Sequence, residues 1–538
     1  MKVCLGFINF YRSVFGNEIL TTAILLLTLA EVAVSQSLPS SMRVVVNSNQ
    51  DGAIKADDVV TLREAIALVN GTLSIEQLSD REKTQVQSLS NNLPSRIEFN
   101  LPLQERAIAI QELLPPLASP GLLIDGTTQP GYDEAKSPVV AITPNKNADI
   151  IRGFTVVADG VTIRGLSIYG FNARHGATAS LPPGDIFIAP LSEVFENKKH
   201  QNLSSTPPKD VVIENNWLGI APDASIPTKT SAFGVSVFNS LGTIIQNNRI
   251  AHHDGSGIIT SVRAENLQVK NNIISHNGLA GMPDAIRLEG IVNNTEITAN
   301  FIQFNAGSGL YLFKPEGSVK IRDNTISNNG QQLQRAAIYL MGKGHEVVNN
   351  KITDQPGTGV TIAAYPQSQG NKIQNNQFAK LQGLSIDLVS QQNVSVIDYQ
   401  QGDGVNPVHD SYQRHRQAGN FGIDAPSFLS REFFILQDES VTLDGLAAPD
   451  SVVEIYKVSE VNSNIGTLNK AIATVNTNSD GRFSVKLGNL KDGERVSAIA
   501  IHPQYGTSEP ADTVVIRDLE QTKKESFIPQ YLTAALLP

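Results

Sequence analysis

The sequence predicts a mainly β protein: a right-handed, single-stranded parallel β-helix over residues 42–426, followed by a small antiparallel β-sandwich. Two observations carry this prediction. A pair of residues ending in Asn recurs about every 26 residues, and short apolar strand patterns lie between the pairs. Repeats of this length are typical of solenoids, which grow by adding repeats rather than by enlarging one core. A length of 538 residues is therefore compatible with one long repeat domain.

The repeat is regular enough to align. Its second Asn occupies the equivalent positions Asn216, Asn248, Asn272, Asn300, Asn324, Asn350 and Asn376. The intervals between them are 32, 24, 28, 24, 26 and 26 residues. A coil of this size holds three short strands, and each strand pairs with its equivalent one coil away, about 4.8 Å distant. Asn suits a fixed turn position because it tolerates left-handed backbone angles and can hydrogen-bond its stacked neighbour. A leucine-rich repeat would need a denser Leu pattern and usually a helix in each repeat.

Residues 61–70 predict an amphipathic helix that caps the N-terminal end of the β-helix. Thr61 and Glu64 have the spacing of a capping box, in which each side chain accepts a hydrogen bond from a free backbone NH group at the helix start. The apolar residues that follow lie on one helical face, and a solenoid needs such a cap to shield its first coil. Residues 72–95 are polar and have no clear period, so we expect an insertion there.

The remaining boundaries follow from where the repeat pattern starts and stops. Aligned repeats occupy about 210–388, and the stretch 172–209 before them, which has two Pro-Pro pairs, is expected to form a long loop leaving the solenoid. Residues 389–426 lack the pattern and are assigned to a C-terminal cap. Short strand patterns over 431–517 predict an immunoglobulin-like sandwich. Residues 518–538 have the character of a weakly ordered tail.

The first 35 residues have the pattern of a secretory signal peptide. Lys2 and Arg12 precede an apolar run of 12 residues, Ile19–Ala30, and Ala33-Val34-Ser35 offers small residues before a cleavage point. The run is too short for a bilayer span, which needs about 20 apolar residues. We therefore expect cleavage after residues 1–35 and a mature chain that is secreted or attached to the cell surface, with no transmembrane segment.

Composition narrows the chemistry of the mature chain. The only cysteine, Cys4, lies inside the expected signal peptide, so the mature chain would have no disulfide and no thiol nucleophile. The net charge is −10 and no basic patch stands out, which argues against nucleic acid as a partner.

Two segments resemble a known group of proteins. Residues 62–66 read Leu-Arg-Glu-Ala-Ile, and residues 124–132 read Ile-Asp-Gly-Thr-Thr-Gln-Pro-Gly-Tyr. Both resemble segments of bacterial secreted parallel β-helix proteins of the pectin-lyase-like superfamily, and the likeness covers roughly residues 42–426. The resemblance implies the fold, export and a surface or extracellular role, and it carries over no reaction. The sandwich is similar to modules that often follow such helices in surface proteins.

Aligning the coils places particular side chains on the outer face of one sheet. If Ile286 and its equivalents point inward, outward columns follow one and three residues later. On or beside these columns lie the carboxylates and the cation that a polysaccharide lyase would use: Asp284, Arg287 and Glu289. The columns also hold aromatic residues that could stack on sugar rings: Tyr311, Phe313 and Tyr339. The alternative interpretation is a surface ladder in which aromatic residues are simply favoured in strands.

No cofactor is firmly indicated, although Ca²⁺ is a candidate. Asp403 and Asp410 have the composition of a Ca²⁺ site, but the residues around Asp403 lack the ligand spacing of an EF-hand loop. The run His252-His253-Asp254 could hold a metal or supply a general base. The alignment instead places its two histidines in turn columns that are mostly polar, which favours a turn ladder.

These observations leave two hypotheses open. The first is an exported cell-surface or extracellular-matrix protein that binds a polysaccharide or a cell-envelope glycan, or acts in adhesion or structure, without catalysis. The second is a polysaccharide lyase, hydrolase or epimerase that acts on an acidic polysaccharide. A cation and carboxylates gathered on one outer face would favour the second, and only Arg287 with Asp284 and Glu289 approaches that arrangement.

Overall fold

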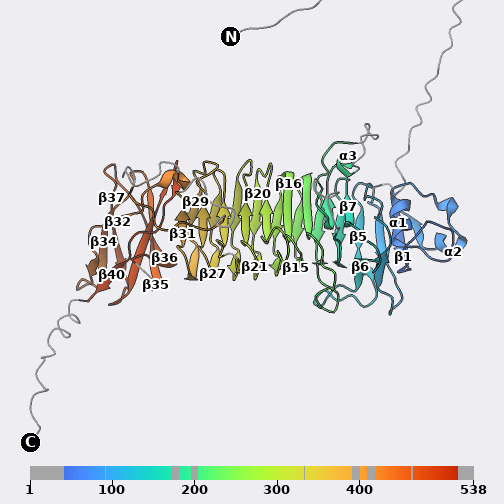
Figure 1. Ribbon diagram of the computed structural model, residues 1–538, viewed down its shortest axis with the longest axis horizontal. Helices are drawn as coiled ribbons and strands as arrows, with labels where there is room; N and C mark the ends of the chain where they lie inside the picture. The colour runs from blue at the N-terminus through green and yellow to red at the C-terminus, as the bar shows by residue number, and fades with distance from the viewer. Residues whose placement is uncertain are drawn as a thin grey trace, which may run out of the picture. The chain divides into compact units, whose positions relative to one another are not determined.

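The computed structural model describes residues 41–90, 92–172, 181–194, 204–332, 334–390, 400–408, 418–461 and 464–518. The chain divides into two compact units, residues 1–38 and residues 39–538. The expected signal peptide falls in the first unit and lies outside the described residues, as does nearly all of the expected tail. Three long sheets and a smaller C-terminal β domain make up the second unit (Figure 1).

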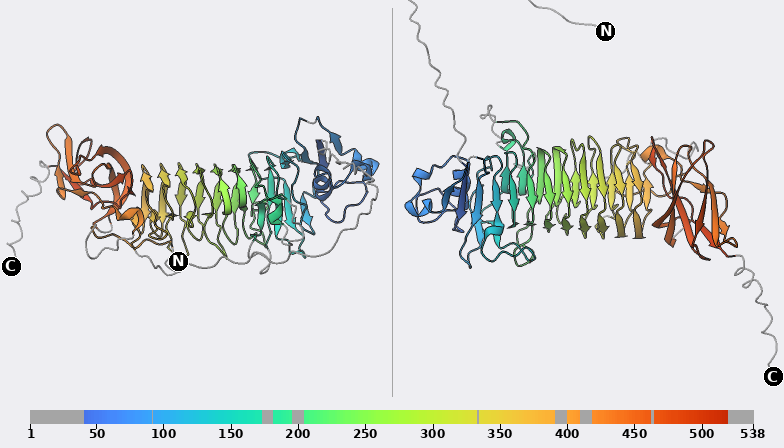
Figure 2. Two further views of the ribbon diagram at one scale, coloured as in Figure 1. Left: turned by 90° about the horizontal axis from the view of Figure 1, so that it is seen from above. Right: turned by 180° about the vertical axis from the view of Figure 1, so that it is seen from behind.

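Each coil of the β-helix contributes one strand to each of three sheets, which we call A, B and C (Figures 1 and 2). Sheet A holds β2 (Val86–Ser88), β1 (Met42–Val46), β3 (Arg96–Phe99), β5 (Leu123–Asp125), β8 (Thr162–Arg164), β11 (Val212–Glu214), β14 (Ile244–Gln246), β17 (Gln268–Lys270), β20 (Thr295–Thr298), β23 (Val319–Arg322), β26 (Glu346–Val348) and β29 (Lys372–Gln374).

Sheets B and C run alongside sheet A with the same coil order. Sheet B holds β4 (Ala107–Ile110), β6 (Val140–Pro144), β9 (Leu166–Ile168), β12 (Trp217–Leu218), β15 (Arg249–Ala251), β18 (Ile273–Ser275), β21 (Phe301–Gln303), β24 (Thr325–Ser327), β27 (Lys351–Gln355) and β30 (Gln377–Leu381). Sheet C holds β7 (Arg152–Val156), β10 (Gly184–Ile188), β13 (Val235–Leu241), β16 (Ile258–Glu265), β19 (Ile286–Leu288), β22 (Leu310–Leu312), β25 (Ile338–Leu340), β28 (Val360–Ile362) and β31 (Ile386–Leu388).

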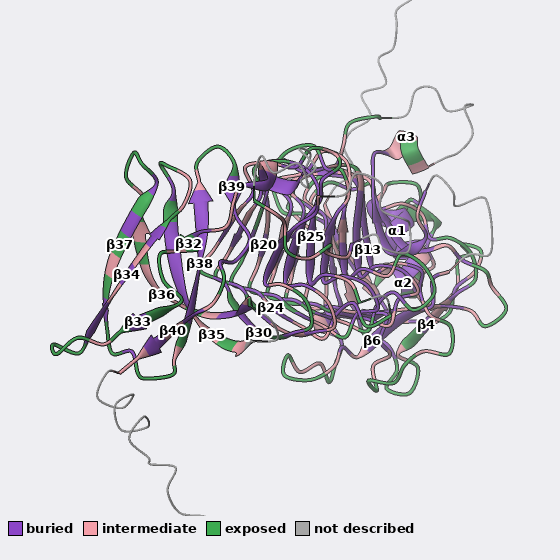
Figure 3. Cartoon of the chain, turned by 60° about the vertical axis from the view of Figure 1, so that its left-hand side comes forward, coloured by how far each residue is buried: buried purple, intermediate pink, exposed green. Residues whose placement is uncertain are grey.

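The structure confirms the parallel β-helix and the predicted alignment of its coils. Ile258, Ile286, Leu310, Ile338 and Val360 are direct neighbours in sheet C. The strands of sheet A carry buried residues at inward ladder positions, among them Ile213, Ile245, Val269, Ile297, Ile321 and Val347. Figure 3 shows strands mainly in the colour of buried residues and many of the turns between them as exposed. The repeated burial of aliphatic side chains supplies most of the driving force for stacking the coils.

A continuous ladder of buried Asn side chains lines the turn between sheets A and B. The side-chain oxygen of Asn272 accepts hydrogen bonds from the backbone N (2.9 Å) and the Nδ2 (3.0 Å) of Asn248 in the preceding coil. The Nδ2 of Asn272 donates to the carbonyl of Ile245 (2.9 Å) and to the side-chain oxygen of Asn300 in the next coil (3.0 Å). The same pattern recurs from Asn216 to Asn376.

The two residues of each Asn pair therefore have different tasks. The first residue adopts a left-handed backbone, with φ of 57° at Asn247 and Asn271 and 56° at Ala299. Asn tolerates this conformation better than most residues. The second residue forms the buried ladder. A parallel ladder of His253, Asn277, Asn305 and Asn329 lines the turn between sheets B and C, which confirms the polar turn expected there.

The N-terminal cap is more extensive than the sequence predicted. Helix α1 (Leu62–Val69) starts at the predicted capping box of Thr61 and Glu64. The expected insertion, residues 72–95, contains a 3₁₀ turn η1 (Ile75–Gln77), helix α2 (Asp80–Lys83) and strand β2, which pairs antiparallel with β1. These elements are too short to show a hydrophobic period in the sequence.

The expected long loop over 172–209 is interrupted by a coil strand, which corrects that boundary. Strand β10 lies between β7 and β13 in sheet C, and the short helix α3 (Leu191–Val194) follows it. All five residues of β10 are buried, because Phe238 and Val194 help to cover its outer side around Phe187. Strand β10 therefore lacks the alternation of apolar and polar residues that marks a strand with one exposed face.

The C-terminal domain has two facing sheets. One contains β32 (Ser427–Phe428), β34 (Ser440–Leu446) and β37 (Arg482–Gly488). The other contains β33 (Glu432–Phe434), β40 (Val514–Arg517), β38 (Arg495–His502), β35 (Val452–Val461), β36 (Gly466–Asn476) and β39 (Gly506–Thr507). Pairing among the described strands is antiparallel except between β33 and the last strand, β40, which run parallel, so the predicted antiparallel sandwich contains one parallel pair. Its likeness to an immunoglobulin domain stays a prediction.

The sandwich also covers the last coil of the β-helix. The carboxylate of Glu454 accepts a hydrogen bond from the backbone N of Asn375 (2.9 Å), and Thr507 Oγ1 accepts one from the backbone N of Ile373 (2.7 Å). Within the predicted cap, the 3₁₀ turn η4 (Gly419–Gly422) supplies Asn420, whose Oδ1 accepts from the backbone N of Asn371 (3.0 Å). No helix among the described residues is long and apolar enough to cross a membrane.

The Asn ladder predicts a position-specific cost of substitution. Replacement of Asn272 by Ala removes the acceptor of two donors on Asn248 and the donor to Ile245, all buried. Each buried polar group that loses its partner costs about 1–3 kcal/mol. We expect Asn272→Ala to lower the free energy of unfolding by about 3 kcal/mol or more, measured by urea titration followed by circular dichroism.

The neighbouring residue supplies a matched control. Asn271→Ala removes an exposed amide at a position that Ala299 already fills in the next coil with nearly the same φ. We expect a clearly smaller loss for this variant. Equal losses for the two variants would contradict the division of tasks within the Asn pair.

Candidate functional site

The outer face of sheet C carries the residues singled out by the sequence, in the predicted register. Arg287, Tyr311, Tyr339 and Thr361 are successive neighbours across β19, β22, β25 and β28. The column continues to Asp387 in β31, the last strand of the sheet. Three of the predicted candidates, Arg287, Tyr311 and Tyr339, therefore lie in one column of sheet C.

Two of the three aromatic candidates are buried, which corrects the expectation that they form an exposed stacking surface. Tyr311 and Tyr339 each expose 2% of their area. They pack with Ala336, Met341 and Ala363 in a small apolar cluster on the outside of the sheet. We conclude that these two rings stabilise the outer face and are not available to a glycan.

A returning segment of the chain anchors to the same face. The backbone carbonyl of Gln400 accepts a hydrogen bond from the backbone N of Ala336 (2.9 Å). Its side chain contacts Ser308 Oγ (3.3 Å) and Asp284 (3.4 Å). Gln400 lies in the predicted C-terminal cap, so the cap folds back along sheet C rather than covering the end of the β-helix alone.

The three candidates for catalysis do come together, but as an ion-pair network. The guanidinium of Arg287 hydrogen-bonds the Glu289 carboxylate and lies 3.8 Å from the Asp284 carboxylate. Asp284 also contacts Arg335 at 3.5 Å and accepts a hydrogen bond from the backbone N of Ser308 at 3.0 Å. Burial raises the pKa of Asp284, while the two arginines lower it. Asp284 is wholly buried, so it holds the arginines in place and cannot reach a substrate.

Phe313 is the aromatic candidate that remains accessible. It is half-buried, and the Arg287 guanidinium lies 4.8 Å from its ring centroid. The ammonium of Lys314 lies 5.4 Å from the same ring and 5.3 Å from the ring of Tyr365. Tyr365 exposes 62% of its area. We call Arg287, Phe313, Lys314 and Tyr365 the Phe313 patch.

The sequence reasoning missed Lys314 and Tyr365. Lys314 follows Phe313 in a left-handed turn, with φ of 46°, and lies beyond the strand residues that were aligned. Tyr365 belongs to the turn after β28, two coils from Phe313. The sequence feature that could have identified them is their position, because each lies just past the C-terminal end of a sheet C strand.

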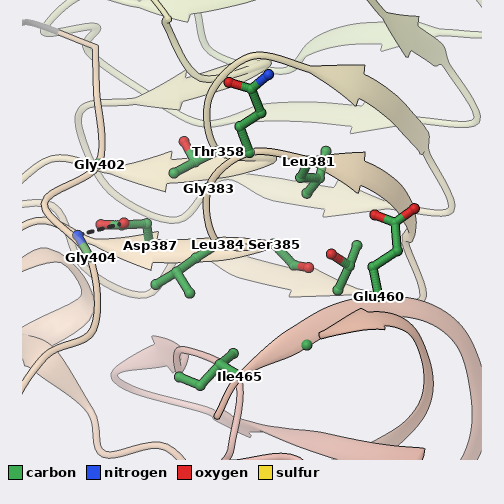
Figure 4. A pocket seen from close by; sticks show the side chains of 13 residues that line it. Thr358, Leu381, Gly383, Leu384, Ser385, Asp387, Gly402, Gly404, Glu460 and Ile465 are labelled. Carbon is green, nitrogen blue, oxygen red and sulfur yellow. Dashed lines mark hydrogen bonds between the residues drawn. The ribbon is translucent and has the colours of Figure 1, made fainter. Parts of the chain in front are cut away.

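A second cluster of carboxylates lies at the last coil. Asp387 accepts hydrogen bonds from the backbone N of Asp403 (3.2 Å) and of Gly404 (3.0 Å), the latter drawn in Figure 4. The sandwich residue Glu509 accepts from the backbone N of Leu388 at 3.0 Å. Burial raises the pKa of Asp387 well above its usual value, and the nearby charges of Glu509 and Asp403 raise it further.

The cluster adjoins a cleft between the last coil and the sandwich. Thr358, Ser385 and Asp387 from the β-helix, Gly402 from the returning segment and Glu460 from the sandwich are among the residues that line it (Figure 4). Its volume is about 230 Å³. No sequence pattern predicts this cleft, because its residues come from three distant parts of the chain.

The structure describes only one of the two candidate Ca²⁺ ligands, Asp403. Asp403 uses one carboxylate oxygen to accept hydrogen bonds from the backbone N (2.9 Å) and Oγ (2.7 Å) of Ser390. Asp410 lies outside the described residues. Within the described part of the chain, no three His, Cys, Asp or Glu side chains are placed to hold a metal ion.

The histidine run forms a structural element. His253 is fully buried, with its Nε2 2.9 Å from Asp185 and its Nδ1 2.8 Å from Asn277. Asp254 accepts hydrogen bonds from Asn172 Nδ2 (2.5 Å) and Thr230 Oγ1 (2.6 Å). A buried, fully bonded His cannot serve as a general base for a solvent-borne substrate.

Comparison with known proteins supports the fold. The family described as "Right handed beta helix region" matches residues 153–283 and 283–411. Among solved structures, the chain is similar to the enzymatically active domain of tailspike protein 2 of bacteriophage CBA120, with 10% identity, a TM-score of 0.36, and coverage of 76% of this chain and 69% of that chain.

Two further solved structures have comparable similarity. For the periplasmic alginate epimerase AlgG the identity is 12% and the TM-score 0.34, over 64% of this chain and 72% of that chain. For ORF18 of Geobacillus virus E2 the identity is 10% and the TM-score 0.43, over 88% of this chain and 76% of that chain. No curated protein sequence matches this chain.

The raised pKa of Asp387 predicts a pH-dependent contribution to stability. The folded carboxyl keeps its proton at pH values where the unfolded chain, with a pKa near 3.8, has lost it. Its stabilising contribution is therefore present at low pH and is lost as the pH rises through the folded pKa. Asp387→Asn cannot ionise, so we expect this variant to gain stability relative to the natural chain as the pH is raised from about 4, measured by urea unfolding.

Asp438→Asn is a control of opposite sign. Hydrogen bonds from Lys486 and Ser440 lower the pKa of the Asp438 carboxyl to about 2, so its contribution is present at higher pH and is lost on acidification. This variant should lose stability relative to the natural chain as the pH rises from about 2 to about 4, the interval between the folded and the unfolded pKa. Unfolding curves for Asp387→Asn that stay parallel to those of the natural chain between pH 4 and 7 would refute the proposed titration of Asp387.

Proposed function

We propose that this chain is an exported cell-surface or extracellular protein that binds an acidic polysaccharide at the Phe313 patch without cleaving or modifying it. The observation that carries the proposal is an accessible aromatic ring between two cations. Phe313 lies beside Arg287 and Lys314, and the exposed ring of Tyr365 extends the same surface.

The chemistry of the patch suits a uronate chain. Aromatic faces pack against the C–H faces of sugar rings, and cations pair with the sugar carboxylates. Among the described residues, no carboxylate lies within 4.0 Å of the Lys314 ammonium, so the cation is available to an anionic ligand. The Arg287 guanidinium is already paired with Glu289, and its role is to hold the Phe313 ring in position.

The burial of Asp284 and the ion pair of Glu289 favour glycan binding over catalysis on this face of sheet C. A lyase or epimerase needs a base that can reach a proton beside the sugar carboxylate. Asp284 is fully buried, and the only partly exposed carboxylate of the candidate trio, Glu289, is paired with Arg287. The export part of the proposal rests on the N-terminal sequence pattern of residues 1–35 and on a mature chain without cysteine.

One observation keeps a carbohydrate-active enzyme as the second candidate function. Asp387 lines the cleft at the last coil, and its pKa is raised well above the usual value. A carboxyl with a raised pKa keeps its proton to a higher pH than usual, which is the property that a general acid toward a glycosidic oxygen needs. Asp403 and Glu509 lie close by but are occupied with backbone donors, so this candidate lacks an evident second catalytic group.

Binding to a uronate polymer tests the first proposal. We expect the mature chain to be retarded in native gels that contain polygalacturonate. Phe313→Ala should weaken binding about fivefold to tenfold, the loss expected for about 1 kcal/mol of ring stacking. Lys314→Gln should have a similar effect that shrinks as salt is added, because ionic contacts are screened.

Val262→Ala removes an exposed apolar side chain, 49% exposed, from the same sheet and serves as the matched control that keeps full binding. Incubation with the same polymer should produce no ultraviolet absorbance from unsaturated uronate. Absorbance that develops and is abolished by Arg287→Ala would establish the enzyme instead. Absence of binding to every uronate polymer tried would rule out the Phe313 patch as an acidic-glycan site.

A further inference from the structure

The outer face of sheet B carries a row of unusual side chains, on residues that the Phe313 patch does not use. Trp217, Arg249, Ile273 and Phe301 are direct register neighbours on four successive coils. We call them the Trp217 row. At a strand spacing of about 4.8 Å the row is roughly 14 Å long. It then gives way to the polar residues Thr325 and Lys351.

The row is exposed although much of it is apolar. Ile273 exposes 41% and Phe301 45% of its area. The guanidinium of Arg249 lies 4.6 Å from the centroid of the Trp217 ring, which fixes the orientation of the only Trp in the chain. Exposed apolar side chains that are aligned, rather than scattered, indicate an interaction surface.

A second row of rings runs beside the first. His252, His276 and Phe304 follow three residues after Arg249, Ile273 and Phe301 on the same coils. Their ring centroids are 5.4 Å and 5.3 Å apart, and Phe304 exposes 44% of its area. Between the two rows lie the less exposed Ala251, Ser275 and Gln303.

The Trp217 row leads into a cleft of about 380 Å³. One wall is the segment 132–138, with Tyr132, Glu134 and Lys136, and the other includes Trp217 and Arg249. The turn residues Asn215 and Asn247 also line the cleft, so amides, charged groups and rings converge in one hollow. Charges of both signs are present, because Glu134 faces a cleft that also holds Lys136 and Arg249.

These features select one occupant. A protein partner of ordinary affinity covers about 800 Å² on each side, far more than two short parallel rows provide when the longer is roughly 14 Å long. A polysaccharide offers C–H faces to rings and hydroxyl edges to amides and charged groups. Lys136 is already paired with Asp133 at 2.9 Å, which leaves one negative and one positive side chain in the cleft, Glu134 and Arg249. This balance of charge favours uncharged sugars. We therefore propose that the Trp217 row and its cleft form a second glycan site, which takes a neutral polysaccharide chain lying along the coils.

Affinity electrophoresis of the full mature chain tests the proposal. Hydroxyethylcellulose, laminarin and galactomannan serve as neutral probes, and we expect retardation by at least one of them. Trp217→Ala, in the cleft, and Phe301→Ala, at the far end of the row, should each weaken that binding about fivefold or more, the factor equivalent to about 1 kcal/mol of stacking.

Matched variants make the outcome specific. Leu279→Ala removes a side chain that is 48% exposed in a nearby turn and should leave binding unchanged. Phe313→Ala should also bind the neutral probe normally, which separates this site from the acidic-glycan proposal: either can fail while the other stands. The inference is overturned if no neutral probe binds, if Leu279→Ala loses as much affinity as Phe301→Ala, or if sedimentation reveals a dimer that Phe301→Ala dissociates.

Discussion

The need to satisfy buried amides at the turns governs the rest of this structure. A parallel β-helix bends sharply three times in each coil, and the turn between sheets A and B carries backbone groups into the interior. The second Asn of each pair meets this need, because its oxygen accepts from the backbone of one coil and its Nδ2 donates to another. The inward ladders add apolar burial, but aliphatic side chains would stack in several registers. The Asn ladder selects one register.

Once the ladder fixes the register, the outward columns follow, and both proposed sites are consequences of it. Trp217 lies beneath Arg249 because each directly follows the second Asn of its pair, and Arg287 lies over Tyr311 as its register neighbour in sheet C. The Trp217 row occupies the residue directly after the second Asn. Each coil therefore contributes one residue to a given outward column, and a ligand surface on this fold needs several successive coils.

This explains how far the sequence could predict the molecule. Periodic features were visible: the coils, the capping box of α1, and the column of Arg287 and Tyr311. Features made by contacts between distant segments were not. Tyr311 and Tyr339 pack with Ala336, whose backbone N donates to the carbonyl of Gln400 in the segment that returns to sheet C, and no local pattern reports that return. The positions of the Trp217 row follow from the repeat, because each member comes directly after the second Asn of a pair, but the exposure of its side chains does not.

The contacts at the end of the Asn ladder show that the sandwich packs against the last coil of the β-helix. In each coil, backbone NH groups donate to acceptors in the next coil. The last coil has no next coil, so its donors need acceptors elsewhere, and a strand edge left without them promotes aggregation. Here the acceptors come from Glu454, Thr507 and Glu509 of the sandwich and from Asn420 before it. Two of these are buried carboxylates of the sandwich, and Glu509 adds to the charge that raises the pKa of Asp387. The raised pKa of Asp387 therefore has two causes. Its burial is the larger, and the other is nearby negative charge, to which the capping carboxylate of Glu509 contributes where it accepts from a backbone NH group at the end of the repeat.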